Sequence, residues 1–165
     1  MEAEVGIKLA TSDDAKQVLQ FLQQAAKESD AVLIPHLKQV TAPQEAKNID
    51  LINQFDDCVM MLAMLDKEVV GIVTVMVLAD QPTTGELGVV VGKKYWRNGI
   101  GQLLVDEAEY WFENYSSLET LVLSVFKTNE AAIKLYQKMN FKIISRRAEK
   151  EHAALQMQYI PDHQD

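Results

Sequence analysis

The sequence predicts a mixed α/β fold with a largely antiparallel sheet. Seven β-rich segments and four segments with helical spacing of apolar residues follow one another in the order β-α-α-β-β-β-α-β-α-β-β. Three β-rich segments are consecutive, and the turn Asp66-Lys67 between the first two favours a hairpin. This order argues against a doubly wound array of βαβ units. With 165 residues, 48% of them hydrophobic and 24% charged, the chain suits a single domain over residues 1–165.

In the first half of the chain, start signals mark both expected helices. Thr11 and Ser12 offer caps for the first helix, and Thr41 with Gln44 matches a capping box that opens the second. The expected elements are strand Val5–Leu9, helix Ala15–Lys27, a connection over 29–40, helix Pro43–Gln54, and the hairpin strands Val59–Leu65 and Glu68–Leu78.

In the second half, a short loop is followed by a third β-rich run, and the pattern then changes to helical spacing. The last two β-rich segments are expected to form an antiparallel pair. The expected elements are loop Gln81–Thr84, strand Glu86–Val91, helix Ile100–Asn114, strand Thr120–Phe126, helix Asn129–Met139, and strands Phe141–Arg147 and Ala153–Ile160.

Composition and charge exclude several classes of protein. The net charge of −8 disfavours binding to nucleic acid. No apolar run approaches the ~20 residues that span a bilayer, and the acidic N-terminus lacks a secretory signal, so we expect a cytoplasmic protein without membrane association. The three histidines are scattered and there is one cysteine, so we expect no metal site. The apolar stretch around Cys58 favours a buried strand thiol over a nucleophile.

A glycine-rich segment is the first candidate for a binding site. Five of the seven glycines lie between Gly85 and Gly101, where an expected strand leads into an expected helix. Free N–H groups at a helix start bind anions, and glycines let a phosphate approach the backbone. Three cations nearby, Lys93, Lys94 and Arg97, reverse the charge of an acidic chain. The segment fits neither a P-loop nor a Rossmann fingerprint, and the alternative is a turn that merely requires glycine.

A second pattern lies in the last expected helix. Asn129 is suited to cap this helix, and Ala132, Ile133 and Tyr136 follow it on one face. Tyr136 can therefore project toward whatever lies near the cap. The alternative is an ordinary core tyrosine.

Together the two patterns resemble the Gcn5-related N-acetyltransferase (GNAT) superfamily. The segment Trp96-Arg-Asn-Gly99-Ile-Gly101 is similar to the acetyl-CoA loop of the family, Gln/Arg-x-x-Gly-x-Gly/Ala. Asn129-x-x-Ala132-x-x-x-Tyr136, followed by Asn140-Phe141, is similar to a second family motif that ends in Gly-Phe. The resemblance implies a GNAT-like mixed, mostly antiparallel central sheet flanked by about four helices.

The resemblance also implies an activity and roles for named residues. The family transfers the acetyl group of acetyl-CoA to an amine by direct attack and needs no metal. Tyr136 would protonate the departing thiolate, and Glu86 would act as the base for the amine or be an exposed strand-end carboxylate. Asn129 would contact the cofactor arm. The backbone groups of Val89, Val90 and Val91 would hold the pantetheine, and the N–H groups of Arg97, Asn98, Gly99, Ile100, Gly101 and Gln102 would hold the pyrophosphate.

Three positions depart from the family pattern. Trp96 replaces Gln or Arg, and Asn140 replaces the glycine before Phe141; neither change is expected to abolish cofactor binding or the helix end. Ser124 stands where enzymes that acetylate ribosomal-protein N-termini have glutamate, which disfavours a peptide N-terminus as acceptor.

The acceptor is expected to be a small-molecule amine. The alternatives are a protein lysine or N-terminal acetyltransferase and a non-catalytic module that binds acyl-CoA. A homodimer is possible because the last strands of this fold often pair between subunits. Charges expected near the acceptor conflict in sign, with carboxylates at Glu28, Asp30 and Asp80 and cations at Arg146, Arg147 and Lys150.

Overall fold

The computed structural model describes residues 4–29, 36–149 and 152–161. Seven strands form one sheet in the order β1-β2-β3-β4-β5-β7-β6, and every neighbouring pair is antiparallel except β4 and β5. The fold class expected from the sequence is confirmed. The strands are β1 Val5–Leu9, β2 Val59–Leu65, β3 Glu68–Leu78, β4 Gln81–Val91, β5 Thr120–Phe126, β6 Phe141–Glu149 and β7 His152–Tyr159.

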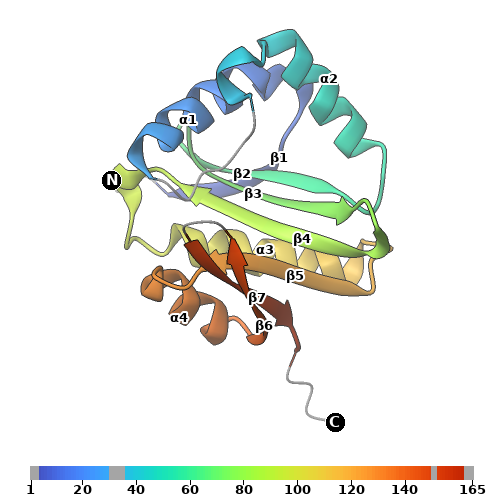
Figure 1. Ribbon diagram of the computed structural model, residues 1–165. Coiled ribbons are helices and arrows are strands. Elements are labelled where there is room, and N and C mark those ends of the chain that lie inside the picture. The colour runs from blue at the N-terminus through green and yellow to red at the C-terminus, as the bar shows by residue number, and fades with distance from the viewer. Residues whose placement is uncertain (1–3, 30–35, 150–151, 162–165) are drawn as a thin grey trace.

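Helices cover both faces of the sheet. Figure 1 shows α1 and α2 on one face and α3 and α4 on the other. Each face has its own hydrophobic core: one joins β2 and β3 to α1 and α2, and the other joins the strands to α3 and α4. The four helices are α1 Ala15–Glu28, α2 Ala42–Asn53, α3 Ile100–Asn114 and α4 Glu130–Lys138, and the short 3-10 turns are η1 Ser12–Asp14, η2 Leu37–Gln39 and η3 Lys93–Tyr95.

The helix-start signals in the sequence form real caps. Thr41 Oγ1 accepts from the Gln44 N–H at 3.3 Å, while the Gln44 side chain accepts from the Thr41 N–H at 2.9 Å. A second capping box joins Thr11 to Asp14 ahead of α1. Asn129 Oδ1 caps α4 by accepting from the Ala132 N–H at 3.2 Å. These bonds satisfy N–H groups that a helix start leaves without partners.

The expected loop Gln81–Thr84 is wrong, because these residues begin β4. Gln81 pairs with Leu78 across a tight turn, and Thr84 pairs with Thr120 of β5. Polar composition suggested a loop, but threonine is favoured in strands, and neighbours on both sides hold these residues in the sheet. Within the connection expected over 29–40, residues 36–40 include η2, and residues 30–35 lie outside the described part.

Candidate active site

The two parallel strands in the middle of the sheet separate part-way along. β4 pairs with β5 at Thr84, Gly85 and Glu86 only, although both strands continue well beyond this point. The second half of β4 therefore keeps β3 as a neighbour and has no strand on its other edge within the described residues. An interrupted ladder leaves backbone groups that need other partners.

The register of β4 on β3 decides which backbone groups face this gap. Val91 lies opposite Gly71, and the Gly92 N–H donates to the Val70 carbonyl at 3.0 Å. In an antiparallel ladder this bond makes Val91 and Gly71 a non-hydrogen-bonded pair. The N–H and C=O groups of Val89 and Val91 therefore point away from β3, toward the gap.

The backbone groups of Val90 were expected to hold the pantetheine together with those of Val89 and Val91, but they point in the opposite direction. Val90 lies opposite Ile72 in the alternating position, so its N–H and C=O groups point toward β3. The carbonyl of Val91 has its own partner, because the Trp96 indole Nε1–H donates to it at 2.8 Å. Trp96 thus fastens the loop after β4 to the end of that strand. The groups facing the gap without such a partner include the N–H and C=O of Val89.

The loop after β4 presents a second set of free donors. Arg97 and Gly99 both have positive φ, 67° and 78°, which turns the chain into α3. The Leu103 N–H makes the first bond of this helix, to the Gly99 carbonyl at 3.1 Å. Among the described residues the N–H groups of Ile100, Gly101 and Gln102 have no hydrogen-bond partner. This helix start is therefore equipped to bind an anion.

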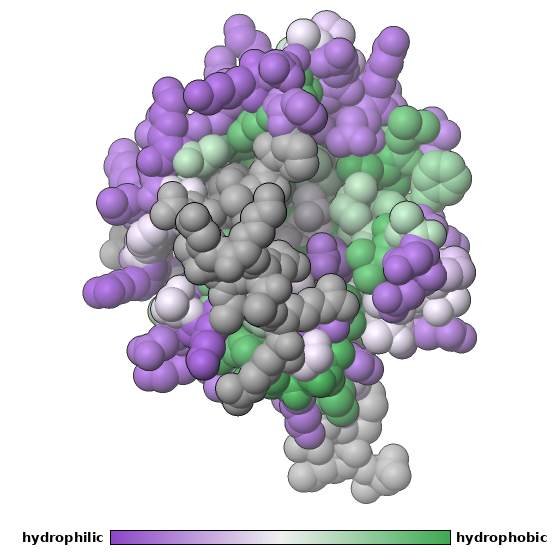
Figure 2. Space-filling model, viewed as in Figure 1, coloured by the Kyte–Doolittle hydropathy of each residue, from purple (hydrophilic) through white to green (hydrophobic). Residues whose placement is uncertain are grey.

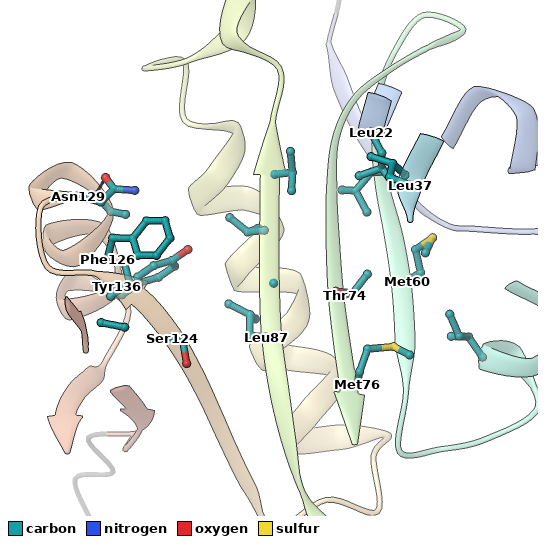
Figure 3. A pocket seen from close by; sticks show the side chains of 18 of the residues that line it. Leu22, Leu37, Met60, Thr74, Met76, Leu87, Ser124, Phe126, Asn129 and Tyr136 are labelled. Carbon is teal, nitrogen blue, oxygen red and sulfur yellow. Dashed lines mark hydrogen bonds between the residues drawn. The ribbon is translucent and has the colours of Figure 1, made fainter. Parts of the chain in front are cut away.

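Two side chains of α4 face the same gap from the β5 side. Figure 3 shows the Tyr136 hydroxyl and the Asn129 amide nitrogen directed toward β4. The Oδ1 atom of Asn129 is used in capping, which leaves its Nδ2 donors for a ligand. Tyr136 is buried, and its ring contacts Phe141 at a centroid distance of 5.9 Å. Burial raises the pKa of Tyr136 to about 12, so the phenol stays protonated and able to donate.

A cavity of about 490 Å³ connects the β4 edge, Asn129 and Tyr136 with residues of α1, η2 and α2, while the α3 start lies outside its described lining. Its middle is lined by Leu87, Gly88, Val89 and Val90 of β4. We call the part next to β5 and α4 the α4 side; it is lined by Ser124, Val125, Phe126, Asn129, Ala132 and Tyr136. We call the part under α1, η2 and α2 the α2 side; its residues include Leu22, Leu37, Val40, Glu45, Asn48, Ile52, Met60, Ile72, Thr74 and Met76.

The cavity has an apolar interior and a hydrophilic surround. Figure 2 shows purple hydrophilic residues over much of the outer surface and green apolar residues in patches between them. None of the described lining residues is Lys, Arg or His, and Glu45 is the carboxylate among them. The cavity therefore suits a ligand with apolar parts.

The family follows from this geometry together with a comparison of sequences. A model of the acetyltransferase (GNAT) family matches residues 35–141, which is more than half of the chain. The chain belongs to the GNAT family. It is an acyltransferase by that membership, and the resemblance in the sequence was based on the loop that leads into α3 and on the motif of Asn129 and Tyr136.

Three relatives illustrate the similarity of this GNAT chain to known proteins. A GNAT-family acetyltransferase from Streptococcus pneumoniae is 30% identical, with a TM-score of 0.86 covering 94% of this chain and 98% of that one. The L-amino acid N-acetyltransferase AaaT of Escherichia coli is 24% identical over 144 residues, 86% of this chain and 85% of AaaT. PaiA N-acetyltransferase from Thermoplasma acidophilum, solved with coenzyme A, shares the fold at 16% identity and a TM-score of 0.75, covering 94% and 99% of the two chains.

Not every residue singled out in the sequence reaches the cavity of this GNAT protein. Glu86 is exposed and does not line it, although it stands at the last paired position before β4 and β5 separate. Glu28 accepts from the Lys93 N–H at 3.0 Å, so it fastens α1 to the loop after β4. Asp80 lies in the exposed turn before β4. Asp30, Lys150 and the side chains of Arg146 and Arg147 lie outside the described part.

Several lining residues gave no signal in the sequence. Glu45 and Asn48 lie on α2 and Thr74 lies on β3, and no sequence motif connects the two elements. Ser124 was noticed as a departure from a subfamily and does line the cavity. Cys58 is half-buried, and burial raises the pKa of its thiol, so it is a poor nucleophile.

No helix within the described ranges is long and apolar enough to cross a membrane. The described residues also contain no cluster of His, Cys, Asp or Glu side chains that could hold a metal ion.

Proposed function

We propose that this protein is a cytoplasmic N-acetyltransferase that uses acetyl-CoA to acetylate a small primary amine, through one domain over residues 1–165. The observation that carries the proposal is the cavity between the separated strands, where the free edge of β4 meets a protonated tyrosine, with the α3 start following β4 outside the described lining. A homodimer stays a prediction.

The residues present fit coenzyme A. Pantetheine carries amide groups that can donate to the free C=O of Val89 and accept from the N–H of Val91 on the free edge of β4, as another strand would. Its pyrophosphate would bind the N–H groups of Ile100, Gly101 and Gln102, with Arg97 nearby as a cation. The Asn129 Nδ2 group can donate to the arm. The bound state of the Thermoplasma relative, solved with coenzyme A, supports this fit.

The side chains then suggest a direct transfer. The amine nitrogen forms a bond to the acetyl carbon as the C–S bond breaks, and no residue of the chain becomes acetylated. The Val89 N–H can stabilise negative charge on the carbonyl oxygen. Tyr136 donates its proton to the departing sulfur, because its neutral phenol lines the cavity and can act as a general acid. Glu86 would receive the amine proton through water, because it does not reach the cavity itself.

A small amine is favoured over a peptide. The α2 side of the cavity is a pocket beneath two helices, and the similarity to an enzyme named for L-amino acids points the same way. A protein lysine or N-terminus is the second candidate, and the separated strands alone would also suit a binding module without turnover.

The proposal is tested by measuring thiol release from acetyl-CoA with polyamines, aminoglycosides, amino acids and short peptides. Acetyl-CoA-dependent melting is followed on the same samples. Turnover with one small amine class supports the proposal, and turnover with peptides alone supports the second candidate. Stabilisation without thiol release for any acceptor, cell extract included, supports the binding module. Saturating acetyl-CoA that leaves the melting temperature unchanged contradicts the cofactor assignment.

A further inference from the structure

A buried carboxylate lies on the α2 side of the cavity, away from the residues assigned to the reaction. Glu45 is only 8% exposed and belongs to the first turn of α2. Its Oε1 atom accepts from Asn48 Nδ2 at 2.9 Å. No described cation forms an ion pair with it. A carboxylate in such surroundings is costly unless a positive charge or further donors compensate it.

The surroundings of Glu45 belong both to the core under α1 and α2 and to the lining of the cavity. Glu45 and Asn48 line the cavity together with apolar residues such as Leu37, Val40 and Ile52. Glu109 Oε2 on α3 is a buried oxygen without a described hydrogen-bond partner, and Glu45 Oε2 is not in that state. Because Glu45 lines the cavity, a bound group can approach its carboxylate.

Glu45 and the reacting centre lie on different sides of β4. Figure 3 places Leu22, Leu37 and Met60, which surround the α2 side, across β4 from Tyr136 and Asn129. Because β4 lies between the two sides, we take the group held by Glu45 to be other than the amine that attacks near Tyr136. Whatever Glu45 binds is a second group of the acceptor, joined to the reacting amine by a part that contacts the apolar lining.

We propose that the acceptor is a compound with two amino groups, whose distal ammonium binds Glu45 and Asn48 while the other amine is acetylated. This inference rests on the function proposed above and names the acceptor class. A free carboxylate at the distal position would meet Glu45 without any described lining cation to balance it, so simple amino acids are disfavoured. An aliphatic diamine satisfies both the carboxylate and the apolar walls.

The test compares two amines that differ in the distal group alone. Thiol release is measured with putrescine and with butylamine, for the wild type and for Glu45→Gln. A charge-assisted hydrogen bond to a buried carboxylate corresponds to a factor of roughly ten or more. We therefore expect kcat/KM for putrescine to exceed that for butylamine at least tenfold in the wild type, and the ratio to fall toward one in the variant.

Two controls separate binding from folding. Asp50→Asn removes an exposed carboxylate from the same helix and should keep the preference for putrescine. The KM for acetyl-CoA and the melting temperature of Glu45→Gln should match the wild type. The wild-type comparison needs no variant, so it decides the matter even if Glu45→Gln does not fold.

The possible outcomes separate a failure of the diamine inference from a failure of the proposed N-acetyltransferase function. Butylamine or leucine acetylated as well as putrescine, with no effect of Glu45→Gln, would overturn the role of Glu45 while leaving an N-acetyltransferase. Absence of thiol release with every amine, despite stabilisation by acetyl-CoA, would overturn the proposed function and this inference together.

Discussion

The two sides of the cavity are built in different ways. The α4 side and the β4 edge offer free backbone groups and two motif side chains, and the α3 start follows β4 outside the described lining, all within residues 87–136. The α2 side is built from side chains of α1, η2, α2, β2 and β3, which span residues 22–76. Chemistry that all members of a family share can rest on the main chain and a few fixed side chains. Recognition of one acceptor rests on side chains that tertiary packing assembles.

The largest effect is expected when the proposed proton donor on the α4 side is removed. Tyr136→Phe should lower kcat by roughly 10²-fold or more, since a general acid contributes on this scale, while the Kd for acetyl-CoA is nearly kept. Because the pKa of Tyr136 is raised to about 12, wild-type activity should show no loss from ionisation of this phenol below about pH 10. Exposed Tyr110→Phe is the matched control. An unchanged kcat where chemistry limits the rate would remove Tyr136 from this role.

A second test contrasts two equally buried carboxylates. Glu45 faces the cavity, whereas Glu109 on α3 does not line it and its Oε2 atom has no described partner. Burial first, and then the nearby Asp106 and Glu113, raise the pKa of Glu109 from 4.5 to about 8. The folded state therefore binds a proton that the unfolded state has released, and stability falls as pH rises from about 4.5 through about 8.

Glu109→Gln should remove this fall in stability. The variant should gain about 1–3 kcal/mol over the wild type at pH 9, the scale of an unsatisfied buried group, and little near pH 4. Urea unfolding at both pH values measures the difference, with exposed Glu107→Gln as the control. If the wild type is equally stable at the two pH values, ionisation of Glu109 does not lower the free energy of unfolding.

A third test strains the backbone at the start of α3. Gly99 has φ 78°, and a Cβ added there would meet no atom within 4 Å, so any effect of Gly99→Ala comes from conformation alone. A left-handed residue other than glycine costs roughly 1–2 kcal/mol, so the Kd for acetyl-CoA should rise about tenfold as the donors shift. Gly6→Ala, where a Cβ is equally free and φ is not positive, is the control. Equal affinities in both variants would contradict a role for this helix start.

The smallest effect is expected when the hydrogen bond between Trp96 and the Val91 carbonyl is removed. Trp96→Phe removes the hydrogen bond to the Val91 carbonyl, which is worth roughly 1 kcal/mol net, so the Kd for acetyl-CoA should rise about two- to fivefold. Tyr95→Phe, which loses a contact of 3.5 Å to Glu68, should have less effect. Calorimetric titration of both variants measures this. A Trp96 variant that binds acetyl-CoA as tightly as the wild type would show that the loop holds its shape without the indole.

Most of the fold could be predicted because its signals are local. Helical spacing and caps at Thr41 and Asn129 depend on residues a few positions apart, and they appear in the structure as expected. The start of β4 was missed because its strand character comes from neighbours rather than from Gln81–Thr84. The orientation of Val90 could not be predicted either, since it depends on the register between two strands.

The candidate site shows the same difference between residues with local sequence signals and residues placed by tertiary packing. Tyr136, Asn129 and the glycines of the α3 start belong to short motifs, so the sequence alone indicated them. Glu45 has no such context: it reaches the cavity because α2 packs over β2, which no spacing along the chain reveals. The charges noticed in the sequence at Glu28 and Asp80 proved to lie elsewhere, because the side on which a loop residue ends up is decided by packing.

The free edge of β4 has a consequence for how this protein can change over generations. Main-chain donors such as the Val89 N–H are the same whichever side chain is present, provided that the strand forms. Substitutions there that keep strand propensity leave the proposed coenzyme contacts in place, and the tryptophan at position 96 shows that the adjoining loop also accepts an unusual residue. Mutations can therefore accumulate on the α2 side and replace one acceptor by another, while the acetyl donor stays constant.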